Sequence, residues 1–274
     1  MLSIIIPTLG TREQELSRLF ESLEKQTSTK FEVIVVSQDK HEVVADLLGE
    51  RAFAYKQVQL NKRGLSYARN EGIKAISGQY VTFSDDDCWY PNDAFEKVED
   101  FFNQNKAQVV CYQIFDPTTN QSYKSYPTEK ADHVRTRDLF RKSSIEMFVD
   151  VQAVDRQYLC FNESFGLGAK HPSGEENIFL FSLQRAGYTI SYIPEVIVYH
   201  LKPTQASRLD ERTMVSKGAL FGALYSKPVD IILLTALFAK KIRHVKRPIH
   251  TYAKAVALTF SEKEVKVNGV KERT

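Results

Sequence analysis

In Tyr80-Val81-Thr82-Phe83-Ser84-Asp85-Asp86-Asp87, a short β-patterned run ends on three consecutive aspartates. In a parallel α/β sheet, ligands bind beyond the carboxyl ends of the strands. Three carboxylates placed there raise one another's pKa unless a cation neutralises them, and such hard oxygen ligands suit Mg²⁺ or Mn²⁺. The run therefore predicts a site for a divalent cation and a phosphate-bearing substrate. The alternative is a solvated acidic turn that caps a helix starting near Asn92.

The segments on both sides of this run alternate between strand and helix patterns. Continuous apolar runs such as Val33-Ile34-Val35-Val36 are typical of strands that are covered on both faces. The predicted strands are 3–6, 33–36, 57–60, 80–84, 108–113, 149–153 and 195–199, and the predicted helices are 12–26, 42–48, 65–76 and 175–186. This order predicts an α/β fold with a mostly parallel sheet and right-handed crossovers.

Composition describes an ordinary folded protein. Of the 274 residues, 43% are apolar and 26% are charged, which suits one large domain or a domain with an appendage. The three cysteines are odd in number and widely spaced, which favours free thiols and a reducing cytosol. The first residues read as a strand and not as a signal peptide, and no apolar run reaches the roughly 18 residues that span a bilayer.

The charge is distributed unevenly along the chain. Residues 214–260 contain eight Lys or Arg and one acid, Asp230, so the formal charge of this segment is +7. Because the net charge of the whole chain is +3, the remaining residues together have a charge of −4. The asymmetry predicts a mildly acidic body over residues 1–205 and a basic helical region over 206–274.

Four motifs in the body resemble those of glycosyltransferase family 2 in their order and spacing, over about residues 1–200. They are Ile4-Ile5-Ile6-Pro7-Thr8, Val33-Ile34-Val35-Val36, Gly64-Leu65-Ser66-Tyr67-Ala68-Arg69-Asn70-Glu71-Gly72 and Phe83-Ser84-Asp85-Asp86-Asp87. The resemblance implies the GT-A fold, a nucleotide-diphospho-sugar donor and transfer with inversion at the anomeric carbon. A bound divalent ion would stabilise the charge that develops on the diphosphate leaving group.

The aspartates form a D-x-D spacing within this frame. Strand alternation points Asp85 and Asp87 to one side and Asp86 to the other. We expect Asp87 to contact the metal directly, and Asp85 or Asp86 to contact the ribose or a metal-bound water. His200 ends a later apolar run, and the family often has a histidine there that faces the metal or the diphosphate. A purely structural histidine at this position is an equal alternative.

The segment 63–72 carries the second group of candidate residues. Gly64 permits an unusual backbone angle where a loop enters a helix. The resemblance implies that this segment lines the donor site, with Arg69 near the nucleotide or the diphosphate and Asn70 beside it. The alternative is that Arg69 pairs with an acid such as Glu71 or Asp86 and that backbone bonds hold Asn70.

The ends of the first two predicted strands are expected to contact the nucleoside. Pro7 and Thr8 would reach the base or the ribose through backbone atoms. In the family the second strand usually ends in an aspartate that reads the base, whereas this chain has Ser37-Gln38-Asp39. Gln38 can donate to and accept from a uracil or thymine edge, which favours a UDP-sugar. No G-x-G-x-x-G follows a strand, so a dinucleotide-dependent dehydrogenase is disfavoured.

A fifth motif supplies candidate catalytic acids. It runs Phe161-Asn162-Glu163-Ser164-Phe165-Gly166-Leu167-Gly168 and continues at Pro172-Ser173-Gly174-Glu175-Glu176-Asn177. In the family an acid pair at this place includes the general base that deprotonates the acceptor hydroxyl. The resemblance assigns that role to Glu176, with Glu175 as a supporting acid, and the reversed assignment stays open. Acids in the first turn of a helix also favour its dipole without any catalytic role.

The basic region suggests where the protein works. Its apolar segments, 217–225 and 229–239, are too short to span a bilayer, and the basic cluster 240–247 follows directly. This pattern fits peripheral binding to an anionic membrane surface, on the cytoplasmic face of the cell membrane. Such a place suits a saccharide or lipid-linked saccharide acceptor in bacterial cell-surface polysaccharide assembly. The alternative is a pair of core-packing helices with solvated basic faces.

Several other functions fit less well. The Q-x-x-R-W element and the long spanning helices of processive synthases are missing, which favours addition of a single sugar. A sugar nucleotidyltransferase shares the layout, and Leu9-Gly10-Thr11-Arg12 faintly resembles its G-T-R signature without the glycines before it or the lysine after it. A non-catalytic sugar- or lipid-binding scaffold would not need the intact aspartates and glutamates. We expect no nucleic-acid partner.

Overall fold

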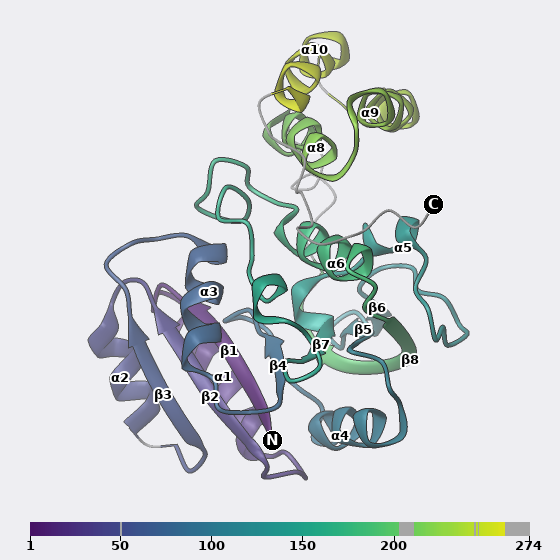
Figure 1. Ribbon diagram of the computed structural model, residues 1–274. Coiled ribbons are helices and arrows are strands. Elements are labelled where there is room, and N and C mark those ends of the chain that lie inside the picture. Colours follow the sequence, from purple (N-terminus) through teal and green to yellow (C-terminus); the bar gives the residue numbers. More distant parts are fainter. Residues whose placement is uncertain (50, 203–210, 244, 246, 261–274) are drawn as a thin grey trace.

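A single mixed sheet organises the body of the protein. The computed structural model describes residues 1–49, 51–202, 211–243, 245 and 247–260 (Figure 1). Eight strands form the sheet in the order β3-β2-β1-β4-β7-β5-β6, with β8 paired to β5. The strands are β1 Leu2–Thr8, β2 Phe31–Ser37, β3 Ala54–Gln59, β4 Tyr80–Phe83, β5 Val109–Asp116, β6 Gln121–Ser122, β7 Met147–Asp150 and β8 Ile190–Tyr199.

Strand directions confirm the predicted mostly parallel sheet. Strands β1 to β4 are parallel, and β5 is parallel to β8. Strand β7 is antiparallel to both β4 and β5 and so joins the two parallel halves. The sequence pattern predicted β7 as a strand but gave no indication of its direction.

Helices cover both faces of the sheet. Those of the body are α1 Glu13–Glu24, α2 His41–Gly49, α3 Leu65–Ala75, α4 Ala94–Gln104, α5 Thr136–Leu139 and α6 Glu175–Arg185, with short 3₁₀ turns at η1 Ser144–Glu146 and η2 Arg156–Tyr158. Because successive strand side chains point to opposite faces, Ile4 and Ile6 pack with α1, α2 and α4, whereas Ile5 packs with α3 and α6. Both layers are needed to bury such continuously apolar strands.

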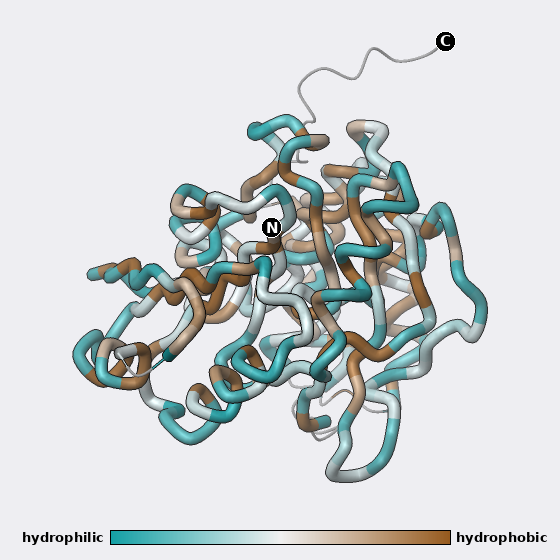
Figure 2. The backbone as a smooth tube through the Cα atoms, turned by 90° about the horizontal axis from the view of Figure 1, so that it is seen from below, coloured by the Kyte–Doolittle hydropathy of each residue, from teal (hydrophilic) through white to brown (hydrophobic). Residues whose placement is uncertain are grey.

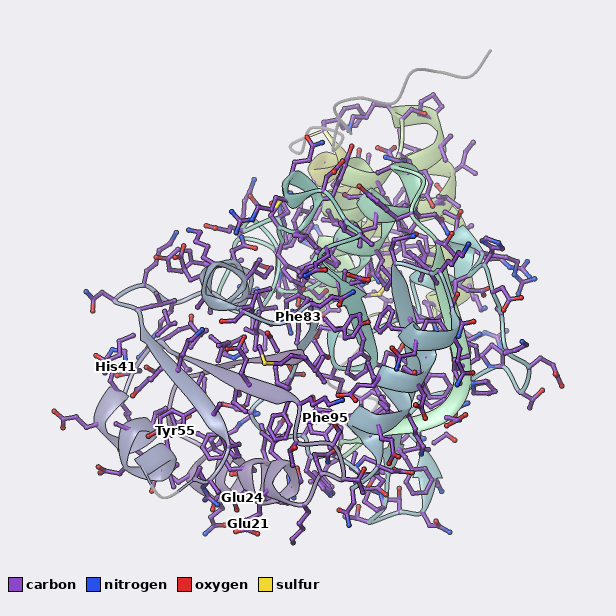
Figure 3. All side chains as sticks on the ribbon, turned by 60° about the horizontal axis from the view of Figure 1, so that its bottom comes forward. Glu21, Glu24, His41, Tyr55, Phe83 and Phe95 are labelled. Atoms are coloured by element: carbon purple, nitrogen blue, oxygen red, sulfur yellow. The ribbon has the colours of Figure 1, made fainter. Side chains whose placement is uncertain are left out.

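The apolar residues of the body gather between these layers. Figure 2 shows hydrophobic strands toward the centre and hydrophilic segments toward the periphery. In Figure 3, Phe83 of β4 and Phe95 of α4 lie inside the molecule, while Glu21 and Glu24 of α1 lie at its rim. Phe83 and Phe95 belong to different cores, one on each side of the sheet.

Three further helices form a separate group beyond α6 (Figure 1). They are α8 Glu211–Leu224, α9 Lys227–Lys241 and α10 Pro248–Thr259. Helices α8 and α10 cross very closely, because a Cβ on Gly218 would lie 1.8 Å from the Ala255 carbonyl oxygen. The domain boundary predicted at 205/206 lies outside the described residues. In the part of the chain that the structure covers, no helix is long and apolar enough to cross a membrane.

The two apolar segments of this region behave differently. Helix α8, which contains residues 217–224, is buried against α6 and α10, so the core-packing alternative holds for the first segment. Helix α9 buries Leu234 and Phe238 but leaves Val229 and Ile232 exposed. Among the described residues, the second segment therefore retains exposed apolar side chains.

Candidate active site

The three aspartates lie in the turn after β4, at the carboxyl end of the parallel strands. Strand β4 ends at Phe83, and the Ser84 N–H still donates to the Ile5 carbonyl at 2.9 Å, which fixes the start of the turn against β1. Asp85 and Asp87 then face His200, while Asp86 turns away and accepts a 2.7 Å hydrogen bond from the Thr8 hydroxyl. The predicted alternation is therefore present, although the residues lie in a turn and not in the strand.

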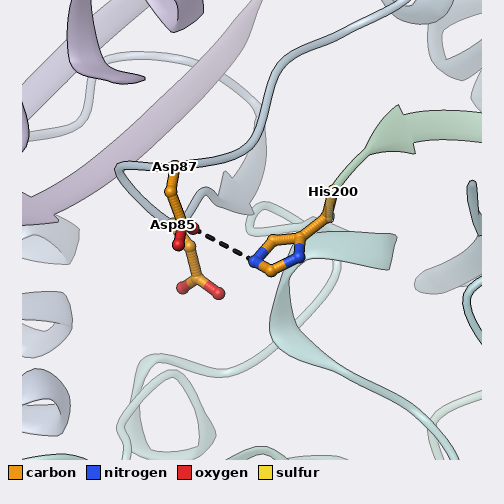
Figure 4. Close-up of side chains that lie close together, drawn as sticks. All are labelled: Asp85, Asp87 and His200. Carbon is orange, nitrogen blue, oxygen red and sulfur yellow. Dashed lines mark ion pairs between the residues drawn. The ribbon is translucent and has the colours of Figure 1, made fainter. Parts of the chain in front are cut away.

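Asp85, Asp87 and His200 form a cluster with the ligand types of a metal site (Figure 4). One ligand atom from each lies within 4.8 Å of the others, and His200 Nε2 is 3.1 Å from Asp87 Oδ1. His200 Nδ1 lies 2.7 Å from the Leu201 carbonyl, which orients the ring so that Nε2 faces the carboxylates. This cluster could bind a divalent metal ion.

The pKa values of the cluster are shifted by burial and by the neighbouring charged groups. Burial raises the pKa of Asp85, with Asp87 adding to the rise and Arg69 opposing it. Burial likewise tends to raise the pKa of Asp87, but the hydrogen bond from His200 outweighs it and holds that pKa below its usual value. For His200, burial alone would lower the pKa, and the bond to Asp87 outweighs burial and raises it. The two groups thus stabilise each other as an ion pair, as a bound cation would stabilise the carboxylates.

Arg12 is a member of the site that the sequence analysis did not single out. Its Nη1 donates to Asp87 Oδ2 at 2.5 Å and to Asp86 Oδ1 at 3.1 Å. Arg12 lies in the loop before α1, within the segment that resembled a nucleotidyltransferase signature. The only indication in the sequence was a basic residue shortly after the end of a parallel strand.

Arg69 connects the aspartates to the glutamates. Its side chain is 1% exposed; Nη2 donates to Asp85 Oδ1 at 3.2 Å and Nη1 to Glu175 Oε1 at 3.1 Å. A further hydrogen bond of 2.7 Å reaches the hydroxyl of Ser144, which the sequence analysis also missed. Neither alternative pairing of Arg69 occurs among the described residues: Glu71 pairs with Lys74, and Asp86 pairs with Arg12.

Arg69→Met is expected to destabilise the fold by about 3 kcal/mol or more, because it leaves Asp85 and Glu175 without their buried cation. Urea denaturation without metal measures the loss. The exposed Arg135, paired with Asp138, provides the control. Arg135→Gln should lower the free energy of unfolding far less than Arg69→Met does. An equal loss in the two variants would show that the burial of Arg69 does not increase its contribution to stability.

The two candidate catalytic glutamates begin helix α6. Gly174 precedes them with φ +109°, a conformation that favours glycine, and a Cβ there would lie 3.0 Å from Leu220 of α8. Glu175 is buried, and its Oε2 has no hydrogen-bond partner among the described residues. Burial and the nearby charge of Glu175 raise the pKa of Glu176 to about 8, with Arg69 and Lys217 opposing the rise. Glu175 is therefore the acid that is bound to an arginine, and Glu176 is the acid with a high proton affinity.

This raised pKa predicts a pH dependence if Glu176 acts as a base. Only the deprotonated carboxylate can accept a proton, so kcat/KM should rise about tenfold per pH unit below pH 8 and level off above it. Initial rates at saturating Mg²⁺ from pH 6 to pH 9 measure the profile. A profile that is flat or falls over this range would contradict the assignment.

One cleft collects most of the predicted site residues. It has a volume of about 670 Å³, and we call it the acidic cleft. The predicted residues on its wall are Pro7, Thr8, Gln38, Gly64, Arg69, Asp85, Asp86, Asp87, Glu175, Glu176 and His200. Arg63, which begins the predicted donor-site segment, lines the cleft too, as do three residues that were not predicted to contribute, Arg12, Tyr123 and Ser144.

Two predicted donor-binding residues are not on that wall. The side-chain amide of Asn70 bonds the Phe161 backbone twice, at 2.7 Å to its N–H and at 3.0 Å to its carbonyl, as the alternative interpretation proposed. Asp39 is half-buried and pairs with Arg63. Gln38 does reach the cleft, and its Oε1 accepts a 2.6 Å hydrogen bond from the Gly64 N–H, which leaves its amide group available to a ligand.

Sequence comparison identifies the family. The model of "Glycosyl transferase family 2" matches residues 3–159, which is more than half of the chain. The chain belongs to glycosyltransferase family 2. A relative from Haemophilus influenzae, named as an uncharacterized glycosyltransferase, is 36% identical over 229 residues, covering 80% of this chain and 74% of its own.

Other members of the family match over shorter stretches. EpsJ of Bacillus subtilis, also named as an uncharacterized glycosyltransferase, is 27% identical over 140 residues, and the match covers 50% of this chain and 40% of EpsJ. A Campylobacter jejuni GalNAc(5)-diNAcBac-PP-undecaprenol beta-1,3-glucosyltransferase is 28% identical, covering 60% of this chain and 55% of its own. The chain thus spans only part of the length of several relatives.

Solved structures confirm the GT-A fold. Residues 1–349 of Staphylococcus aureus TarS in complex with UDP match with a TM-score of 0.64 at 18% identity, covering 94% of this chain and 82% of that one. The mannosyltransferase PcManGT from Pyrobaculum calidifontis, in complex with GDP-Man and Mn²⁺, gives a TM-score of 0.56 at 14% identity, covering 94% and 73%. The family and fold inferred from the sequence motifs are both confirmed.

Proposed function

We propose that this protein transfers one sugar from a nucleotide-diphospho-sugar, with a UDP-sugar favoured, to a hydroxyl of a saccharide acceptor with inversion. The observation that carries the proposal is the convergence of the Asp85–Asp87–His200 cluster, Arg12 and the glutamate pair on one acidic cleft of a family 2 chain. Solved relatives of the same fold were obtained with UDP, UDP-GlcNAc or GDP-Man bound.

The ligand atoms that the cleft offers suit Mg²⁺ or Mn²⁺. Asp85, Asp87 and His200 would hold the ion, which supplies a Lewis acid for the negative charge on the leaving diphosphate. The raised pKa of the half-buried Asp85 fits this role, because a carboxylate crowded by other acids is stabilised when a cation arrives. The Mn²⁺ in the complex of PcManGT supports the same assignment.

Residues of the chain perform the remaining steps. Arg12 supplies positive charge on the side of Asp86 and Asp87, where the diphosphate would lie. The Glu176 carboxylate accepts the proton of the acceptor hydroxyl as its oxygen attacks the anomeric carbon. The bond to the nucleoside diphosphate breaks on the opposite face, which produces inversion. Glu175, which is bound to Arg69, holds the start of α6 in place and so positions Glu176, the proposed general base.

A coupled measurement tests this function. Nucleoside diphosphate release should require the donor sugar, a divalent ion and an acceptor saccharide together, and NMR of the product should give the anomeric configuration opposite to that of the donor. Retention of configuration, or pyrophosphate release from a sugar phosphate and a nucleoside triphosphate, would contradict the proposal; the second result would favour a nucleotidyltransferase.

The acceptor is proposed to be lipid-linked, at an anionic membrane surface on the cytoplasmic side, in cell-surface polysaccharide assembly. The printed name of the Campylobacter relative, which specifies an undecaprenol-linked substrate, supports this. Helix α9 exposes an apolar stripe at Val229, Ile232 and Ala236, and Ile249 of α10 is 84% exposed. Lys240 and Lys241 end α9 beside its stripe, a pattern that suits an interfacial helix.

Changing the basic cluster to glutamine is expected to abolish most binding to anionic vesicles. The positions are Lys240, Lys241, Arg243, Lys246 and Arg247, of which Lys246 lies outside the described residues. Each basic residue near an anionic surface contributes about 1 kcal/mol, and salt screens this attraction. Co-sedimentation with neutral and anionic vesicles at low and high salt measures the effect.

The matched control changes exposed lysines of the body, Lys25, Lys30, Lys106 and Lys130, to glutamine. This control should bind vesicles as the wild type does. Transfer to a soluble acceptor should survive in both variants. Wild-type protein that stays in the supernatant under all conditions would rule out the membrane proposal.

A further inference from the structure

A second cavity lies behind one wall of the acidic cleft. Its volume is about 320 Å³, and its lining includes Lys124, Tyr126, Arg141, Lys142 and Tyr192; we call it the rear pocket. Lys142 lines the rear pocket, whereas the next residues, Ser143 and Ser144, line the acidic cleft. One short segment of chain therefore separates the two cavities.

Lys142 is the unusual residue of this pocket. Its side chain is only 6% exposed, and its Nζ lies 4.0 Å from the centre of the Tyr192 ring. Among the described residues, the ammonium has no hydrogen bond and no carboxylate partner. A cation–π contact offsets only part of the cost of burying a charge, so a buried ammonium normally has an anion beside it.

Among the other cations of the pocket, the exposed Arg141 hydrogen-bonds to the Ser125 carbonyl and has no carboxylate partner in the described residues, whereas Lys124 and Arg135 are paired with acids. Lys124 pairs with the fully buried Glu146 at 3.0 Å and donates to the Ser143 hydroxyl at 2.9 Å. Arg135 pairs with Asp138 at 2.8 Å. Glu129, the remaining acid on the wall, is exposed and forms no ion pair with Lys142 in the described structure. Of the two cations without an acid partner in the described residues, Lys142 is therefore the buried one and Arg141 the exposed one.

Two tyrosine rings give the pocket an apolar wall. Tyr126 and Tyr192 are nearly parallel, at 7° with their centres 6.4 Å apart. Both hydroxyls are bonded, that of Tyr126 to Glu146 at 2.6 Å and that of Tyr192 to the Pro127 carbonyl at 2.9 Å, so the rings are fixed in place. A volume near the lower end of small-molecule pockets, an aromatic wall and one convergent charge describe a site for a small ligand.

We infer that the rear pocket binds a small organic anion, a sugar-sized molecule whose phosphate or carboxylate pairs with the Lys142 ammonium. This site is separate from the acidic cleft and does not depend on the proposed transfer reaction. Its occupant would contact Lys142, which lies two residues before Ser144, and the Ser144 hydroxyl accepts a 2.7 Å hydrogen bond from the buried Arg69. The pocket is therefore placed to influence the donor side of the cleft.

Thermal unfolding in metal-free buffer of constant ionic strength tests the inference. Glucose 1-phosphate and glucuronate are expected to raise the melting temperature saturably, and uncharged glucose is not. Inorganic phosphate, tested as a third anion, shows whether the charge alone is enough for binding. If it raises the melting temperature less than glucose 1-phosphate does, the tyrosine wall contributes to binding. If the two raise it equally, the pocket recognises the anion alone. Lys142→Met should weaken the binding of these anions at least tenfold.

Two controls keep the result interpretable. Lys130→Met removes an exposed lysine from the same part of the chain and should leave anion binding unchanged. Arg12→Gln removes a cation of the acidic cleft and should also leave it unchanged. Protection that is lost in Arg12→Gln and kept in Lys142→Met would place the anion in the acidic cleft and overturn the inference.

The stability of the ligand-free variant provides a second readout. Because the mostly buried Lys142 has no acid partner in the described residues, Lys142→Met should keep or raise the melting temperature in the absence of anions. A marked fall in melting temperature, or no saturable protection of the wild type by any of the three anions, would assign Lys142 a purely structural role against Tyr192.

Discussion

Asp87→Ala is expected to abolish sugar transfer and to remove the strengthening of nucleotide binding by Mn²⁺, while the protein stays folded. Asp87 is the acid that His200 and Arg12 both contact, so its loss removes one of the three proposed metal ligands and releases a second, His200, from its partner. Calorimetric titration of UDP with and without Mn²⁺ measures the metal dependence. A folded Asp87→Ala variant whose UDP affinity still increases with Mn²⁺ would contradict the metal assignment.

The matched control for this variant is Asp93→Ala. Asp93 lies six residues after Asp87, immediately before helix α4, and pairs with Lys97 at 2.9 Å on the surface. It is not a member of the Asp85–Asp87–His200 cluster. It should retain both transfer and the Mn²⁺ effect. Circular dichroism of both variants separates loss of the site from loss of the fold.

Glu176→Gln is expected to lower turnover about 10²-fold or more with donor affinity nearly unchanged. Glutamine keeps the size and the hydrogen-bonding shape of the side chain but cannot accept the proton of the acceptor hydroxyl. The remaining activity should also lose the rise in rate toward pH 8 that the raised pKa of Glu176 predicts. Steady-state kinetics with saturating donor measure both effects.

Glu175→Gln distinguishes the two acids. Glu175 accepts a hydrogen bond from Arg69 and is buried, so its replacement should lower stability as well as activity. If Glu175→Gln loses turnover without losing stability while Glu176→Gln stays active, Glu175 is the base. Full activity in both variants would remove the pair from the mechanism.

The sequence predicted the first half of the fold well, for a physical reason. Strands β1 and β2 are buried on both faces and so read as continuous apolar runs, and the apolar stripe of α1 (Leu16, Leu19, Phe20) is buried as its spacing implied. The direction of β7 could not be read, because a four-residue apolar strand looks the same in either direction. The two-residue β6 carries no periodic signal at all.

The site was predictable where it depends on strand ends. Thr8 ends a parallel strand, and Gln38 and Asp85 lie just after the ends of two others; the sheet brings such residues to one edge. Arg12 and Ser144 were missed because their roles come from contacts with Asp86, Asp87 and Arg69, which are distant in sequence. Asn70 could not be distinguished from a cleft residue, because its partner, the Phe161 backbone, is 91 positions away.

A donor screen tests the central proposal, a metal-dependent nucleotide-sugar site in the acidic cleft, most directly. The melting temperature is measured with UDP-, GDP- and dTDP-sugars, each with and without Mn²⁺, because a ligand that binds only the folded state raises that temperature. We predict that at least one nucleotide-sugar, with a UDP-sugar favoured, stabilises the wild type only when Mn²⁺ is present, and that the effect is lost in Asp87→Ala. Absence of stabilisation by every donor, or stabilisation that is the same without Mn²⁺, would contradict the proposal.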